Sequence, residues 1–274
     1  MRYEKFMPKV ASLAFAIWWL SHTAAFAWGG EGHHIVARIA ADELTPRAKA
    51  AVADLLGGDA TARMIQTSTW ADEIRPNRPE TAPRHYANIE ITSTGYDAAR
   101  DCPNDDCVVG QVERDARIIG DPAISKPVRA DALRFLIHFV GDMHQPLHCA
   151  DNHDHGGNSV RVAFEGRRTN LHAIWDTAGV QALGSSEDEV AAGLEKEITQ
   201  QDRTDWRRGS ASDWANETFG VAKASVYQGV QGRGSNNAPL ILPPEYAISQ
   251  RAIVAMQLER AGVRLAGLLN QHLK

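Results

Sequence analysis

The feature that most constrains this sequence is the histidine-rich stretch at 135–158, which reads FLIHFVGDMHQPLHCADNHDHGGN. His138 and Asp142 are four residues apart in an apolar segment that predicts a helix, so both side chains project from one helical face. Pro146 ends that helix, because a helix interior tolerates proline poorly, and His148 follows on the turn. The stretch therefore brings imidazole and carboxylate groups together.

A second pair with the same spacing, His172 and Asp176, occurs in the segment LHAIWD. Imidazole and carboxylate groups on adjacent helical turns are a common way for a protein to hold a divalent cation, above all zinc. The alternative is two helices that each carry a hydrogen-bonded histidine–aspartate pair. Two such pairs, with a third histidine on the intervening turn, favour a metal site.

The first residues have the pattern of an export signal at 1–27. Basic residues precede VASLAFAIWWL, an apolar run of 11 residues, and Ala-Phe-Ala at 25–27 fits the small-x-small rule for cleavage. The run is shorter than the ~20 residues of a membrane-spanning helix. A retained amino-terminal anchor is the alternative. We expect instead a secreted or periplasmic protein that is cut after Ala27 and has no membrane segment.

The net charge of the chain limits the kinds of molecule that it can bind. The formal net charge is −5, and removal of three basic residues and one acidic residue with the leader would take it to −7. Such a balance argues against broad electrostatic binding of duplex nucleic acid, which relies on many lysine and arginine contacts. A polyanionic substrate stays possible, because bound metal ions would concentrate positive charge at one site.

The three cysteines indicate an oxidising compartment. Cys102 and Cys107 bracket a short turn-rich loop and are expected to form a small disulfide bond in an exported protein. Cys149 is left over next to His148, where it is either a metal ligand or, as we favour, a small buried residue.

Periodicity predicts a mainly α-helical single domain over 28–274 with a small β-hairpin. The segment HYANIEI alternates and is the best early strand candidate, and we expect it to pair with SVRVAFEG at 159–166. A helix is expected at 46–57, because a proline lies in its first turn and glycines follow its end. The other helices are expected at 34–44, 67–75, 108–120, 127–144 and, as a long packed terminal helix, 247–273.

The ordered set of motifs resembles one family. It is the zinc-dependent single-strand-specific nuclease family of fungi and plants, the S1/P1 nucleases, which has bacterial members and shares its helical fold with zinc phospholipase C. The resemblance covers the whole chain after the leader. The motifs are Trp28-x4-His33, Trp70-Ala71-Asp72, His85-Tyr86-Ala87-Asn88, His138-x3-Asp142-x5-His148, Gly156-Gly157-Asn158 and His172-x3-Asp176.

The resemblance implies a cluster of three zinc ions. An amine already joined in a peptide bond cannot bind metal, so cleavage before Trp28 would also activate the enzyme. The first ion would be held by Asp72, His85, His138 and Asp142, the second by His148, His172 and Asp176, and the third by the amino group and carbonyl oxygen of Trp28, His33 and a shared oxygen of Asp142.

The resemblance also implies how the substrate is held. Zinc lowers the pKa of bound water to ~7 and neutralises phosphate oxygens. Asp72 would steer the attacking water and Arg75 would bind the phosphate. Tyr86 would stack on a base, as suits a single strand. Asn88 stands where the fungal enzymes carry an aspartate that bonds the base edge, and Asn158 would line the same pocket.

We therefore predict a monomeric, exported endonuclease that hydrolyses single-stranded RNA and DNA to 5′-phosphate products, with 3′-nucleotides as further substrates. Two alternatives stay open: a zinc-dependent phospholipase C, and a zinc-binding protein without catalysis. The aromatic residue after His85, the match at Arg75 and the Gly-Gly-Asn segment favour the nuclease. No role is assigned to His144, His153 or His155.

Overall fold

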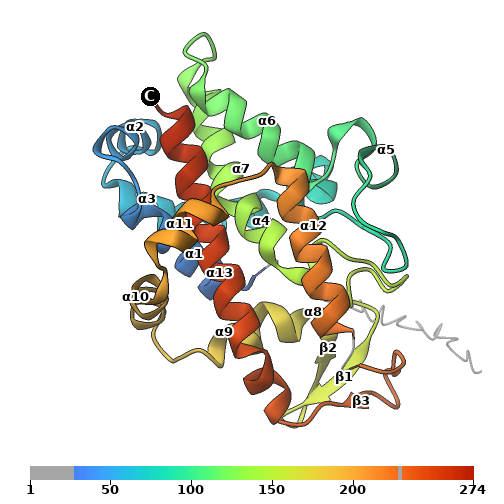
Figure 1. Ribbon diagram of the computed structural model, residues 1–274. Coiled ribbons are helices and arrows are strands. Elements are labelled where there is room, and N and C mark those ends of the chain that lie inside the picture. The colour runs from blue at the N-terminus through green and yellow to red at the C-terminus, as the bar shows by residue number, and fades with distance from the viewer. Residues whose placement is uncertain (1–27, 228–229) are drawn as a thin grey trace, which may run out of the picture.

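The computed structural model describes residues 28–227 and 230–274, so the predicted leader at 1–27 lies outside the described residues. Helices make up most of the described chain, and a small sheet lies at one end (Figure 1). The predicted mainly α-helical fold is thereby confirmed. The α-helices are α1 (Gly30–Asp42), α2 (Pro46–Leu56), α3 (Ala60–Thr67), α4 (Trp70–Ile74), α5 (Ala98–Asp101), α6 (Val108–Gly120), α7 (Lys126–His144), α8 (Leu171–Ala173), α9 (Gly179–Gln181), α10 (Glu187–Glu197), α11 (Gln200–Trp206), α12 (Ala211–Val221) and α13 (Glu245–His272).

Shorter elements connect these helices. The strands are β1 (Arg161–Phe164), β2 (Arg167–Asn170) and β3 (Leu240–Ile241). The 3-10 helices are η1 (Pro79–His85), η2 (Pro103–Asp105) and η3 (Pro146–His148), and the π-helical segments are η4 (Ile174–Ala178) and η5 (Ala222–Val226).

The centre of the fold is α7. From Leu133 to Met143 its apolar residues occur on every side, and almost all of this run is buried. A helix that is apolar all round is stable only when other elements surround it. It packs against α6, α13, α2, α4 and α1, among others. His138 and Asp142 are therefore carried into the interior, where both are completely buried.

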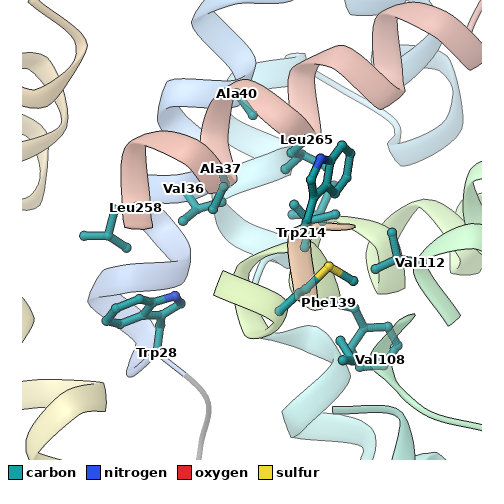
Figure 2. Close-up of a cluster of buried hydrophobic side chains, with 14 of the residues drawn as sticks. Trp28, Val36, Ala37, Ala40, Val108, Val112, Phe139, Trp214, Leu258 and Leu265 are labelled. Atoms are coloured by element: carbon teal, nitrogen blue, oxygen red, sulfur yellow. The ribbon is translucent and has the colours of Figure 1, made fainter. Parts of the chain in front are cut away.

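A continuous hydrophobic core surrounds this helix. Figure 2 shows Trp28, Val36, Phe139, Trp214 and Leu258 among its members. Trp28 precedes α1, and the others belong to α1, α7, α12 and α13. The predicted terminal helix is confirmed as α13, which packs along α1 and α7. In the described part of the chain, no helix is both long and apolar enough to cross a membrane.

Local signals set several helix ends correctly. The Thr45 side chain accepts a hydrogen bond from the Ala48 backbone N–H, and α2 ends at Gly57, which has a positive φ.

The helix expected at 67–75 is shorter than predicted, because α3 ends at Thr67 and α4 begins only at Trp70. The break between them releases backbone carbonyls from helical hydrogen bonding.

The sheet differs from the prediction. β1 pairs with β2 in an antiparallel hairpin and with β3 in parallel, so the spatial order is β2-β1-β3. The expected strand at 85–91 is not part of this sheet. Its first residue ends η1, and the rest makes one isolated bridge, from Glu90 to Asp151. The prediction that it pairs with 159–166 is wrong.

The alternating pattern in this segment has another cause. Ala87 and Ile89 are buried while Tyr86 and Asn88 are exposed, so the backbone is extended with one face inward. Three of its backbone hydrogen bonds join it to His148 and Asp151; for example, Ala87 N–H donates to the His148 carbonyl oxygen over 2.8 Å. Alternation reports which face is buried, and it does not identify the partner segment.

Candidate metal centre

The eight histidine and aspartate residues predicted as metal ligands lie together in the structure. They form three groups, and within each group one ligand atom per residue lies within 4.8 Å of the others. No further group of this kind was found among the described residues. The groups are His33, His138 and Asp142; Asp72, His85 and His138; and His148, His172 and Asp176.

Asp142 lies at the centre of the cluster. Its Oδ2 is 2.9 Å from His85 Nδ1 and 3.3 Å from His138 Nε2, while its Oδ1 is 3.3 Å from His33 Nε2. Burial alone would raise the pKa of this carboxyl, but the charge on His138 and hydrogen bonds from the surrounding imidazoles hold the pKa well below its usual range. The two oxygens of an ionised carboxylate thus face different ligand groups.

His138 is oriented by the backbone. Its Nδ1 donates to the Ser68 carbonyl oxygen over 2.6 Å, at the break between α3 and α4. This hydrogen bond directs Nε2 toward Asp142 and Asp72. Burial disfavours the imidazolium, yet the two carboxylates outweigh it and raise the pKa of His138 to about 9. The protonated ring of His138 therefore places a positive charge between two carboxylates. A metal cation can occupy the same position instead.

The third group gives the strongest test of whether a cation fits. His148 Nδ1 donates to the His85 carbonyl oxygen and His172 Nδ1 donates to the Gly156 carbonyl oxygen, each over 2.6 Å. In each neutral ring Nε2 then carries a lone pair and no proton. The two Nε2 atoms lie only 3.1 Å apart. Burial lowers the pKa of each ring to about 4. Two acceptors facing each other at this distance repel unless a cation lies between them.

Asp176 completes this group, with its Oδ2 3.4 Å from His172 Nε2. Burial raises the pKa of this carboxyl well above its ordinary value, so an ionised Asp176 needs a nearby positive charge. Gln145 Nε2 donates to Asp176 Oδ1 over 2.6 Å, which orients the carboxylate. Sequence reasoning missed Gln145. Its position between Asp142 and His148 was the signal that the sequence offered.

Trp28 lies beside the cluster. Its side chain is completely buried, and the next residue, Gly29, donates its N–H to the Asp176 carbonyl oxygen over 2.8 Å. Gly32 leaves room for the indole, because a Cβ at that position would lie 2.7 Å from the Trp28 Cβ. The start of the described chain is thus held between α1, which carries His33, and η4, which carries Asp176.

The residues expected to hold the substrate surround one cavity next to the ligands. This substrate cavity has a volume of about 200 Å³. Arg75 enters it with its Nη1 3.6 Å from Asp72 Oδ1, and Tyr86 is 37% exposed there. His155, to which the sequence assigned no role, also lines it. The lining residues are Arg75, His85, Tyr86, Asn88, Leu147, His148, His155, Gly156, Asn158 and His172.

The loop that carries Gly156 has its own support, which sequence reasoning also missed. Asp154 is buried, and its Oδ1 accepts from the Gly157 N–H over 2.8 Å and from the Tyr227 hydroxyl over 3.0 Å. By fixing this turn, Asp154 positions the Gly156 carbonyl oxygen that orients His172.

The remaining cysteine and histidine residues lie outside the three groups. Cys102 and Cys107 form the expected disulfide bond, and Cys149 is buried, with its thiol donating to the Met143 carbonyl oxygen. His144 is buried and accepts from Arg264 Nη1 over 2.9 Å.

Comparison with known proteins identifies the relatives of this chain. The family model described as S1/P1 Nuclease matches residues 28–274. The chain belongs to the S1/P1 nuclease family. This family member is 31% identical to Endonuclease 2 from Arabidopsis thaliana, an alignment that covers 92% of the chain and 93% of the relative. It is 30% identical to Nuclease P1 from Penicillium citrinum and to Nuclease PA3 from a Penicillium species, with 89% of the chain and 97% of each relative covered.

Proposed function

We propose that this S1/P1 family member is an exported zinc-dependent endonuclease that cuts single-stranded RNA and DNA and leaves 5′-phosphates. Membership of the family supports nuclease activity. The single observation that carries the finer proposal is the set of three ligand groups around Asp142, next to a cavity that holds an arginine and an exposed tyrosine. We propose in addition that the enzyme hydrolyses nucleoside 3′-phosphates and that it is a monomer.

The donor atoms support zinc as the metal. Neutral imidazoles and carboxylates are the ligands that zinc takes in catalytic sites. Two features favour a cation: the facing Nε2 atoms of His148 and His172, and the buried Oδ1 of Asp142, which has no hydrogen-bond partner among the described residues. Three groups suit three ions, with Asp142 shared and the amino group of Trp28 as one further ligand after cleavage of the leader.

The chemistry follows from a metal ion and two positioned side chains, Asp72 and Arg75. When bound, zinc supplies a Lewis acid that makes water a nucleophile near neutral pH and offsets phosphate charge. Asp72 Oδ1 is buried without a hydrogen-bond partner, so it can accept a proton from the attacking water. The guanidinium of Arg75 binds the non-bridging phosphate oxygens and stabilises the charge that develops on them.

Selection of a single strand comes from the outer part of the substrate cavity. Tyr86 presents a ring on which a base can stack, and stacking needs a base that has left its duplex partner. Asn88 and Asn158 line the same cavity. A carboxamide both donates and accepts, so these two residues can bond the edge of more than one base.

The test combines metal analysis with activity. We would measure the zinc content of the protein that begins at Trp28, and its cleavage of single-stranded RNA, single-stranded DNA, duplex DNA and phosphatidylcholine. We expect about three zinc ions and chelator-sensitive cleavage of the single strands. Cleavage of the lipid alone would move the protein to the phospholipase branch, and zinc without any cleavage would make it a binding protein.

A matched pair of variants links activity to the ligand groups. Asp142→Ala removes the shared carboxylate and should abolish cleavage and lower the zinc content. His153→Ala is the control, because His153 is exposed, its Nε2 lies 3.5 Å from Glu90 Oε1, and it belongs to none of the three ligand groups. Normal activity of Asp142→Ala would refute the assignment.

A further inference from the structure

A second cavity adjoins the metal centre on the side away from Tyr86. Its volume is about 720 Å³, compared with about 200 Å³ for the substrate cavity. Gly29 and Asp176 form part of its wall, and Asn158 lines both cavities. The group of His148, His172 and Asp176 therefore lies between them. We call this second space the sheet cavity, because residues of β1 and β2 form much of its lining.

The sheet gives this cavity two arginines. Successive side chains of a strand point to opposite faces, and on β1 Val162 and Phe164 are buried while Arg161 is on the other face. Arg161 pairs with Asn170, and Ala163 pairs with Arg168. Paired residues share a face of the sheet. Arg161 and Arg168 are thus diagonal neighbours on one face, and both line the sheet cavity.

The charge of this cavity is positive. Neither Arg161 nor Arg168 makes an ion pair with another described residue, whereas several arginines elsewhere do, for example Arg84 with Asp106. Arg168 Nη1 donates to the Asn236 carbonyl oxygen over 2.7 Å, which holds its guanidinium in place. The only acidic residue in the lining is Asp176, a proposed metal ligand. In a chain with a net charge of −5, two adjacent cations without acidic partners indicate an anionic ligand.

We propose that the sheet cavity binds the sugar-phosphate backbone of a single-stranded substrate beyond the nucleotide held at Tyr86, with Arg161 and Arg168 on its phosphates. This inference rests on the proposed nuclease function. A strand that crosses from one cavity to the other passes the ligand group between them. A volume of about 720 Å³ suits this role, since pockets for ligands of nucleotide size span roughly 300–1,000 Å³.

Polar groups around the arginines complete the site. Ser235 and Asn236 line the cavity and can bond sugar hydroxyls and phosphate oxygens. None of these contacts reads a base edge specifically. The sheet cavity is therefore expected to increase affinity for longer strands without adding base preference.

Substrate length separates this site from the catalytic one. A dinucleotide contains one phosphate, the scissile one, so it cannot make further phosphate contacts. We would compare a dinucleotide with a strand of roughly eight nucleotides, a length typical of single-strand sites. The variants are Arg161→Ala, Arg168→Ala and the double variant. Arg161→Lys keeps the charge, and Arg47→Ala is the matched control, an exposed arginine on α2, far from the sheet (Figure 1).

The double variant should lose roughly tenfold or more in kcat/KM on the longer strand and stay within roughly twofold of the parent on the dinucleotide. The slope of log KM against log salt concentration should fall by about 0.7 for each arginine removed. Arg161→Lys should keep the slope, and Arg47→Ala should change nothing.

Two results would overturn the proposal: an unchanged kcat/KM and salt slope for the double variant on the longer strand, or an equal loss on both substrates. If the proposed nuclease function itself is wrong, the parent enzyme will cleave neither substrate, and this result differs from both of those above.

Discussion

Gly141 offers a sharp test of how the ligands are held. It lies inside α7, between His138 and Asp142, where glycine costs about 0.5–1 kcal/mol relative to alanine. A Cβ built on Gly141 would lie 2.9 Å from His33 Nδ1 and 3.1 Å from His33 Cε1. The imidazole of His33 thus lies against the helix at the one position that has no side chain. Gly141→Ala should therefore displace a proposed metal ligand without replacing any of the proposed ligand residues.

The size of the effect follows from these distances. An ordinary contact of a Cβ begins at 3.4 Å, so the ring must move by roughly half an ångström. His33 also stacks on His138 with a centroid distance of 4.0 Å, and its Nε2 is 3.3 Å from Asp142 Oδ1. Overpacking costs about 1–3 kcal/mol, and the gain in helix propensity offsets about 0.5–1 kcal/mol. We expect a net loss of up to about 2.5 kcal/mol in the free energy of unfolding.

The displaced ligand should weaken metal binding more than it weakens folding. Misplacing a ligand through its supporting contacts typically costs about 10–100-fold in metal affinity. Zinc-buffered dialysis, followed by elemental analysis, gives the occupancy, and urea unfolding gives the stability. Gly141→Ala should lose the ion near His33 first and retain the ion at His148 and His172.

Gly220→Ala is the matched control. Gly220 lies in α12, and a Cβ there would meet nothing within 4 Å, so this variant should gain about 0.5–1 kcal/mol and keep its zinc. If Gly141→Ala binds zinc as tightly as the parent protein and unfolds at the same or a higher urea concentration, His33 is not held against α7 as described here.

Three further predictions concern other parts of the chain. Burial raises the pKa of the Asp115 carboxyl to about 7, although a hydrogen bond from Gln111 acts in the opposite direction. The folded state therefore binds the proton more tightly than the unfolded state, and stability falls as the pH rises from about 4 to 7. Asp115→Asn should raise the melting temperature by an amount that grows over this range and is absent near pH 3; an equal shift at every pH would contradict this. A variant with one extra residue before Trp28 should bind one zinc fewer by elemental analysis, whereas full zinc content would show that the amine is not a ligand. Replacing Cys102 and Cys107 by serine should cost about 2 kcal/mol in urea unfolding, as expected for so short a loop; zinc content should not change, and its loss would mean that the loop supports the cluster.

The sequence by itself predicted which residues lie together as candidate metal ligands, and part of their geometry. His138 and Asp142 share a helical face because the period of a helix is set by hydrogen bonds that span only four residues. For the same reason the ends of α2 and the position of α13 could be predicted from caps and apolar periodicity. The order of the motifs also led to the family, which the comparison confirmed.

Tertiary structure decided how these residues meet. Three of the five imidazoles in the cluster are oriented by a carbonyl oxygen from another segment, such as Ser68 for His138 and Gly156 for His172. Gln145 and Asp154, which orient these ligands and their loop, look like ordinary polar residues in the sequence. No local pattern encodes such contacts, because each depends on segments far apart in the chain.

The strand prediction at 85–91 failed for the same physical reason. Alternating burial was correct for Tyr86 and Asn88, but a strand is completed by hydrogen bonds to another segment, and the sequence did not identify it. β1 pairs with β3, about 80 residues further on, and this pairing helps to form the sheet cavity with its two arginines. Local bonding thus made the helical pairs predictable, whereas the sheet, the ligand orientations and the second cavity required the folded chain.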